Sequence, residues 1–173
     1  MRRGGGFFEQ GRDAERSRAL TAAERTLLPP PLAAGVDLDR VRIIARWHTP
    51  IAMMLNVTIV RGARIFWKNA PEEATTLGER AHLAHELVHV WQYLALGRTG
   101  IELLASRRYD YDLDPGRPFI AYGYEQQASI VEDFTRLAGG ARARRLRGPA
   151  PPLSDYERVI ESASAAGAAG FIA

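Results

Sequence analysis

The stretch His85-Glu86-Leu87-Val88-His89 decides both the fold and the chemistry expected of this chain. It has the form H-E-x-x-H, with two histidines four residues apart. On a helix, residues at this spacing project from one face, so both imidazoles can bind a single ion. Zinc accepts nitrogen and oxygen ligands in a tetrahedral shell. The stretch therefore predicts a helix that carries part of a zinc site.

The residues around this stretch predict a long, mostly buried helix over 77–96. They are mainly strong helix formers and include no proline. Leucine and valine recur at steps of three and four, which gives the helix an apolar stripe. Gly97 follows the last apolar turn and is expected to end the helix. Polar side chains are then confined to one restricted face.

The third zinc ligand must come from another part of the chain. A catalytic zinc has three protein ligands and one open position, and a chain without cysteine can offer only histidine and carboxylate side chains. A second helix is predicted over 124–137, with Glu125 and Glu132 on one face. Glu125 is favoured because the small Ala128 lets this helix pack closely on the first. Glu132 is the alternative ligand.

Each histidine ligand is expected to have a hydrogen-bond acceptor beside its second ring nitrogen. A metal-bound imidazole donates its other ring N–H to a fixed acceptor, and Glu132 or Asp133 are the candidates on the second helix. His82 lies one turn before His85 and is too far from His89 to share its metal. We interpret His82 as an outer partner of the site at most, with an ordinary surface histidine as the stronger alternative.

Glu86 gives the site an expected activity, the hydrolysis of a peptide bond. It stands next to His85, where it can take a proton from a zinc-bound water and pass it to the leaving amine. The oxyanion that forms needs a further hydrogen-bond donor. Four side chains are candidates for that donor: Tyr122, Tyr124, Tyr111 and Arg117. We select Tyr122 and Tyr124 as the catalytic candidates beside Glu86.

A non-catalytic protein is the main alternative. A zinc-stabilised binding or accessory domain would have the same ligands and no turnover. Glu86 favours the enzyme, since a purely structural site needs no base at that position. The small size of the chain, 173 residues, favours the alternative slightly, because little chain remains to build a deep substrate cleft.

The remaining pattern predicts an α+β fold, with a small antiparallel or mixed sheet packed on the two ligand helices. A strand is expected over 41–47, and a hairpin over 56–67 about Gly62. Capping boxes at Thr21 and Ser154 predict two short helices. We divide the chain into a flexible segment (1–20), the zinc domain (21–138), and a linker rich in Arg, Gly and Pro with a short C-terminal helix (139–173).

Charge and hydropathy argue against a nucleic-acid partner and against a membrane span. The formal net charge is +3, and four arginines gather in the segment after the second helix: Arg142, Arg144, Arg145 and Arg147. No aromatic residues alternate with them, so a solvated linker is favoured over a nucleic-acid site. The apolar runs are too short to cross a bilayer, and the N-terminus lacks the apolar segment of a signal peptide. We expect a cytoplasmic origin, with export by a route that needs no signal peptide left open.

Several segments together resemble one bacterial family. They are His85 to Gln92, Arg64-Ile65-Phe66-Trp67, Tyr124-Glu125-Gln126-Gln127-Ala128 and Val131-Glu132-Asp133. These are similar to short, Vgr-related H-E-x-x-H proteins and to the metallopeptidase domain associated with contractile injection systems. The resemblance implies a gluzincin-like fold with zinc between two helices, and a secretion- or injection-system partner. No substrate transfers from this family, so the expected peptide or protein substrate rests on the predicted zinc chemistry alone.

The segment Glu125-Gln126-Gln127-Ala128 is also similar to CAAX-type and HtpX-type membrane peptidases. In those enzymes the corresponding glutamate is the third zinc ligand, which implies the same role for Glu125. This chain departs from them at Ser129, where they carry an aspartate, and it has none of their membrane spans.

Overall fold

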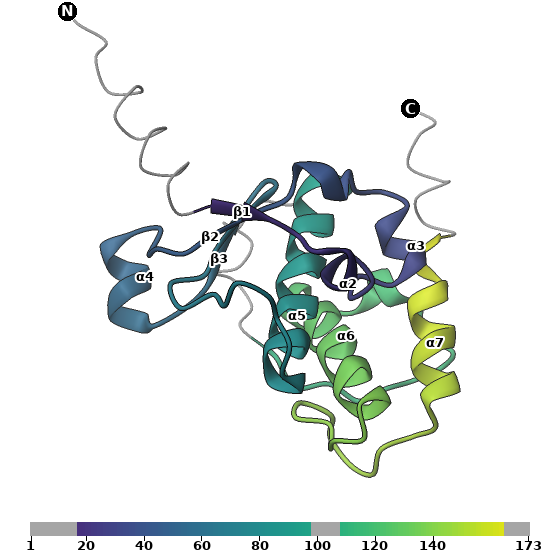
Figure 1. The fold of residues 1–173 in the computed structure, drawn as a ribbon. Coiled ribbons are helices and arrows are strands. Elements are labelled where there is room, and N and C mark those ends of the chain that lie inside the picture. Colours follow the sequence, from purple (N-terminus) through teal and green to yellow (C-terminus); the bar gives the residue numbers. More distant parts are fainter. Residues whose placement is uncertain (1–16, 98–107, 165–173) are drawn as a thin grey trace, which may run out of the picture.

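The computed structural model describes residues 17–97 and 108–164. A small four-stranded sheet lies against the long helix α5 (Leu77–Leu94), a second long helix, α6 (Tyr124–Ala138), packs along α5, and the helix α7 (Leu153–Glu161) packs on α6 (Figure 1). The expected α+β class is therefore confirmed. Residues 1–16, which make up most of the predicted flexible segment, lie outside the described part.

The sheet is mixed and its strands are short. They are β1 (Ser17–Ala19), β2 (Arg42–Ile44), β3 (Ile59–Arg61) and β4 (Arg64–Phe66), in the order β1-β2-β4-β3. The predicted hairpin is present as β3 and β4, which pair antiparallel around Gly62 at a φ of +59° that glycine adopts readily. The predicted strand over 41–47 is shorter, because the chain turns back after Ile44, where the N–H of Arg46 bonds to its carbonyl.

A mixed sheet was one of the two predicted forms, but the parallel pairing of β2 with β4 was not specified. It sets Ile43 opposite Ile65, and both side chains are buried against α5 and the short helices. The connection between the two strands contains α4 (Pro50–Leu55), also unpredicted, which begins with Thr49 as its N-cap and ends at Asn56 in the left-handed region. A parallel pair needs such a crossover, which no local pattern in the sequence reveals.

Both long helices occur where the sequence predicted them. Thr76 and Glu79 form a capping box that begins α5, and α5 stays helical through Leu94, two residues short of the predicted end. Leu83, Leu87 and Val90 of its apolar stripe are fully buried in the main core, whereas Leu94 in the last turn is 43% exposed. The second helix, α6, begins after Gly123 and packs along α5, with Ala128 fully buried.

Four short elements complete the described chain. They are α2 (Ala22–Arg25), α3 (Pro30–Ala33) and the 3-10 turns η1 (Leu38–Arg40) and η3 (Phe119–Ala121). The predicted capping box at Thr21 is confirmed at the start of α2. The prolines that follow α2 also begin α3, since proline suits the first helical turn. No helix in the described ranges is long and apolar enough to cross a membrane.

The C-terminal segment belongs to the folded body as far as residue 164. Tyr156, Val159 and Ile160 of α7 are buried in the main core, so the described residues continue across the expected domain boundary at 138. The predicted capping box at Ser154 is wrong. The helix α7 begins at Leu153, two residues before the start that a Ser154 N-cap implies, and its N-cap, Pro152, has no side-chain hydrogen bond.

Glu24 joins the strand β1 to the segment that precedes α5. Its carboxylate accepts two 2.7 Å hydrogen bonds from Arg18 and 2.9 Å bonds from the N–H groups of Thr21 and Ala74. The Glu24 side chain is 1% exposed. Burial opposes its charged form, but the ion pair with Arg18 and the two backbone donors hold the pKa of Glu24 below its usual value of 4.5.

We predict that Glu24→Gln destabilises the fold by about 2 kcal/mol at neutral pH, because it removes the charge that Arg18 and two buried N–H groups face. A lowered folded-state pKa gives stability that is present above pH 4.5 and is lost as the pH falls through the folded-state value. The difference between wild type and variant, measured by urea unfolding, should therefore shrink below pH 4.5. The exposed Glu72→Gln is the control, and an equal loss in both variants would contradict the prediction.

Candidate metal centre

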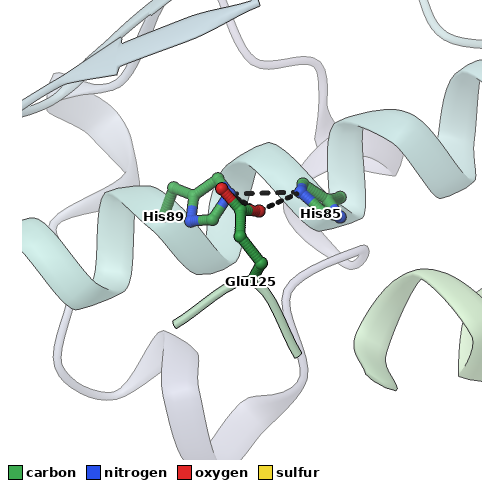
Figure 2. A group of neighbouring side chains, drawn as sticks. All are labelled: His85, His89 and Glu125. Carbon is green, nitrogen blue, oxygen red and sulfur yellow. Dashed lines mark hydrogen bonds and ion pairs between the residues drawn. The ribbon is translucent and has the colours of Figure 1, made fainter. Parts of the chain in front are cut away.

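Three predicted ligands converge between the two long helices. His85 and His89 project from the middle of α5, and Glu125 projects from the first turn of α6. The Nε2 atoms of the histidines are 3.1 Å apart, and Oε2 of Glu125 is 3.3 Å from Nε2 of His85 and 3.2 Å from Nε2 of His89. Figure 2 shows the Glu125 carboxylate facing both imidazoles. The alternative ligand, Glu132, is not part of this triangle.

The triangle fits a tetrahedral zinc ion. Ligands placed about 2.0–2.1 Å from zinc in a tetrahedron are about 3.3–3.4 Å from one another, close to the three distances between these atoms. The Oε2 atom of Glu125 is buried and has no hydrogen-bond partner, which leaves it free for a cation. Two imidazoles and one carboxylate are also the donor set of many catalytic zinc sites, and they leave a fourth position open.

Gln92 fixes the orientation of His89. Its Oε1 atom lies 2.7 Å from Nδ1 of His89 and accepts the N–H there, so that Nε2 presents its lone pair to the site. The Gln92 amide nitrogen donates in turn to the carbonyl of Tyr124 and to Oε1 of Gln127, each at 2.8 Å. Both glutamines are fully buried. This network ties His89, the second candidate ligand on α5, to the start of α6.

Glu132 lies at the Nδ1 atom of His85, as Gln92 does at the Nδ1 atom of His89. Its Oε2 atom lies 3.2 Å from Nδ1 of His85, at ion-pair distance, as one of the two predicted outer partners. Burial opposes the charged imidazolium, but the carboxylates of Glu125 and Glu132 prevail and raise the pKa of His85 to about 10. Burial likewise opposes the charge of Glu125, yet His85 and His89 lower its pKa to about 2. The metal-free site thus holds a proton that a metal ion would replace.

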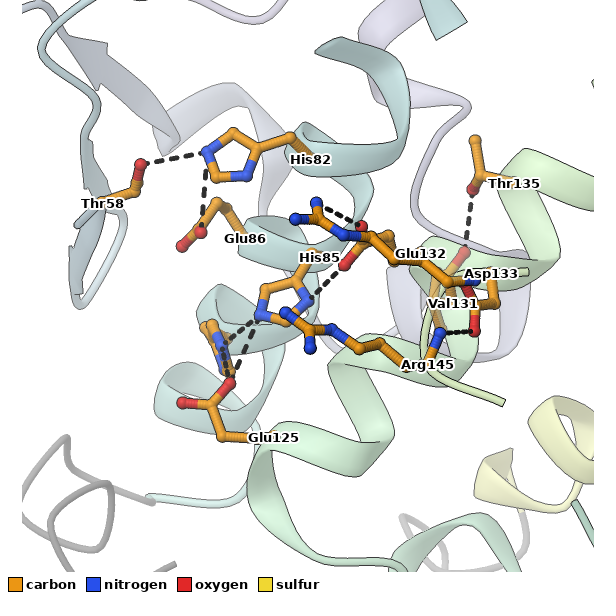
Figure 3. Close-up of polar contacts among 12 residues, drawn as sticks. Thr58, His82, His85, Glu86, Glu125, Val131, Glu132, Asp133, Thr135 and Arg145 are labelled. Atoms are coloured by element: carbon orange, nitrogen blue, oxygen red, sulfur yellow. Dashed lines mark hydrogen bonds and ion pairs between the residues drawn. The ribbon is translucent and has the colours of Figure 1, made fainter. Parts of the chain in front are cut away.

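Glu86, the predicted base, is buried beside the triangle. Its charge contributes to the raised pKa of His85, and its Oε1 atom is 3.8 Å from Nε2 of His82 (Figure 3). His82 is half-buried, lies 3.0 Å from the hydroxyl of Thr58, and makes an edge contact with Trp67. His82 is therefore a neighbour of the predicted base, and the interpretation of an ordinary surface histidine does not describe it.

The predicted oxyanion donors lie in different surroundings. Tyr124 is beside the centre, with its ring stacked on His89 at 4.6 Å between centroids. The hydroxyl of Tyr122 instead bonds to the backbone of Asp114, and the guanidinium of Arg117 lies 4.4 Å from the centroid of the Tyr122 ring. The hydroxyl of Tyr111 donates to Asp133. Of the four candidates, only Tyr124 has a described contact with a zinc ligand.

Three residues at the centre were missed in the sequence: Tyr109, Arg145 and Gln92. The ring of Tyr109 stacks on His85, with 6.2 Å between centroids, and the guanidinium of Arg145 lies 4.9 Å from the centroid of Tyr109. No spacing rule links these positions to the motif. Gln92 was also missed, although its place one turn after His89 is a local signal for an outer partner of that ligand.

Comparison with known proteins gives a relative in sequence and in structure. No protein-family model matches the chain. In an alignment of 136 residues that covers 72% of this chain, the chain is 29% identical to the type VI secretion system spike protein VgrG2b of Pseudomonas aeruginosa PAO1. It spans about 13% of that protein. The structure resembles the effector domain of Pseudomonas aeruginosa VgrG2b with a TM-score of 0.60 and 26% identity, covering 75% of this chain and 78% of that one. The expected resemblance to Vgr-related bacterial proteins is confirmed, and the chain is similar to a secretion-associated effector domain.

Proposed function

We propose that this chain is a zinc-dependent peptidase with a gluzincin-like arrangement of two ligand helices. The observation that carries the proposal is the buried triangle of His85, His89 and Glu125, whose edges of 3.1–3.3 Å match a zinc shell with one open position. Zinc in such a shell supplies a Lewis acid that activates water near neutral pH and polarises a carbonyl. A carboxylate directly beside the open position is what distinguishes a catalytic site from a structural one.

Glu86 is the general base and acid of the proposed reaction. It lies beside the zinc ligands, where it can accept a proton from the attacking water and return it to the leaving amine. His82, 3.8 Å from this carboxylate, helps to orient it. Tyr124 keeps the ring of His89 in place by stacking. A tyrosine hydroxyl at the centre would donate a hydrogen bond to the oxyanion. Tyr124 and Tyr109 are the candidates, because their rings stack on His89 and His85.

We further propose that the chain acts as an effector domain exported by a type VI secretion system. The support is its similarity to the effector domain of VgrG2b, together with the absence, in the ranges the structure describes, of a helix that could span a membrane. Its partners would be a secretion spike and a peptide or protein substrate met after export. A zinc-stabilised accessory domain without turnover is the alternative, and it shares every feature of the site except a need for Glu86.

We predict that the metal-free protein binds one zinc ion and releases protons as it does so. Because the pKa of His85 is raised to about 10, its imidazole is protonated at neutral pH and must lose that proton to bind. The apparent affinity should rise about tenfold per pH unit for each proton released, as long as the pH is below that value. Calorimetry in buffers of different ionisation enthalpy measures the proton count.

The ligand variants test the same assignment. Glu125→Ala should abolish stoichiometric zinc, whereas Glu132→Ala should weaken binding about 10- to 100-fold, as expected for an outer partner. Elemental analysis of protein purified without a metal-affinity tag gives the stoichiometry. Loss of zinc only in Glu132→Ala would move the ligand by seven residues, and a wild type without zinc after supplementation would contradict the metal centre.

We predict that Glu86→Gln keeps zinc and loses about 10²- to 10⁴-fold of the peptide hydrolysis, since the amide has the shape of the carboxylate but cannot take a proton. Cleavage of a mixed peptide library, read by mass spectrometry, is the measurement. The exposed Glu157→Gln on α7 is the matched control and should cleave as the wild type does. A wild type that binds zinc and cleaves no peptide would favour the accessory domain.

A further inference from the structure

The arginine loop, residues 141–147, is built onto α6 by one buried carboxylate. Asp133 is fully buried, and it accepts hydrogen bonds from the backbone N–H groups of Arg144, Arg145 and Leu146 at 2.6, 2.9 and 3.1 Å. The loop also pairs with Tyr111 through two backbone hydrogen bonds. The solvated linker predicted from composition is therefore wrong here, and the backbone of the loop is held in one place.

This anchoring carries the side chain of Arg145 to the metal centre. Its guanidinium lies 4.9 Å from the centroid of Tyr109, and the same ring stacks on the zinc ligand His85. Figure 3 shows the Arg145 side chain running from the loop beside Asp133 toward His85. The side chain is one third exposed, so it is reached from solvent while its stem is packed.

Arg145 has donors that the described protein does not use. Its Nε atom is buried without a hydrogen-bond partner, and its nearest described carboxylate, that of Asp110, is 3.8 Å away and half exposed. That distance is too long for a hydrogen bond. The terminal nitrogens of a guanidinium placed over an aromatic ring can take a carboxylate in two parallel hydrogen bonds.

The surrounding charges select a small anion and not a polyanion. Glu86, Glu125 and Glu132 surround His85 with negative charge, which disfavours the closely spaced phosphates of a nucleic acid. One carboxylate on a peptide can reach Arg145 while the rest of the peptide lies at the metal centre. Two sources offer that group: the C-terminus of the peptide and an acidic side chain near the bond to be cleaved.

We propose that Arg145, held by Asp133 and stacked on Tyr109, is the specificity residue of the site and binds a carboxylate of the peptide substrate. The inference rests on the proposed function for the identity of its ligand as a peptide. It makes this chain a peptidase for substrates with a carboxylate near the scissile bond. Arg144, 3.9 Å from Glu132 and largely exposed, adds positive charge at the same rim.

Binding of defined peptides to the full, zinc-loaded chain tests this, with Glu86→Gln present to prevent cleavage. The probes are acetyl-tetra-alanine as the free acid, the same peptide as its C-terminal amide, and an amidated peptide with one glutamate. Calorimetry gives the dissociation constants, and the Nε–Hε signal of Arg145 in a nitrogen-edited NMR spectrum reports direct contact. We expect at least one carboxylate peptide to bind about tenfold or more tightly than the neutral amide and to shift that signal.

Two side-chain variants separate recognition from loop structure. Arg145→Gln should remove the preference for the carboxylate, and because Asp133 holds only the backbone N–H at this position, the loop should stay folded. Arg147→Gln is the matched control on the same loop and should keep the preference, since the Arg147 side chain lies toward Asp112. Thermal unfolding of both variants checks the fold. Tighter binding of the free acid than of the glutamate peptide identifies a C-terminal carboxylate, and the reverse identifies an acidic side chain.

Equal affinities for all three probes, no binding of any of them, or an unchanged preference in Arg145→Gln would each overturn the inference. These results are distinct from a failure of the proposed function. Zinc-dependent cleavage of neutral peptides without a carboxylate preference would leave the peptidase in place and remove the role of Arg145. A carboxylate preference without any cleavage by the parent chain would keep the role of Arg145 in binding and remove the peptidase.

Discussion

The convergence of two imidazoles and one carboxylate in a buried space is the constraint on which the packing of α5 and α6 depends. Burying such groups is unfavourable unless their charges and hydrogen bonds are compensated. Here the compensation is mutual, because Glu125 and Glu132 stabilise the charged imidazolium of His85 in the metal-free protein. A divalent ion would take over that role. The same atoms that complicate the packing of the two helices are thus the ones that fit a metal.

The buried polar groups around the centre form a connected hydrogen-bond network, and each bond holds a side chain in one position. Gln92 orients His89 and reaches the start of α6 through Tyr124 and Gln127. Their side chains occupy an interface that apolar residues would fill at lower cost, since a buried polar network stabilises a fold only when its members are satisfied. Their presence between α5 and α6 is explained by the need to hold a ligand in one orientation.

Sequence reasoning succeeded where the signal is local. The spacing of His85 and His89, the apolar stripe of α5, and the position of Glu125 on a second helix are all set by helical periodicity. The hairpin around Gly62 is local as well. The parallel pairing of β2 with β4 depends on contacts between distant segments, and the shortened β2 depends on a turn that no residue pattern marks. The gluzincin-like assignment stays a prediction from the resemblance.

The arginine loop is the clearest case in which composition alone gives the wrong structural prediction. Glycine and arginine between 139 and 147 are typical of a solvated linker, yet a single aspartate on α6 accepts three successive backbone N–H groups and fixes the loop. Glu132 and Asp133 are neighbours on this helix, one directed to His85 and the other to the loop. One turn of α6 therefore sets both the partner of His85, a proposed zinc ligand, and the place of Arg145. Any change in the position of α6 would move Glu125, Glu132 and the arginine loop together, which would couple the proposed metal chemistry to the proposed recognition of a substrate.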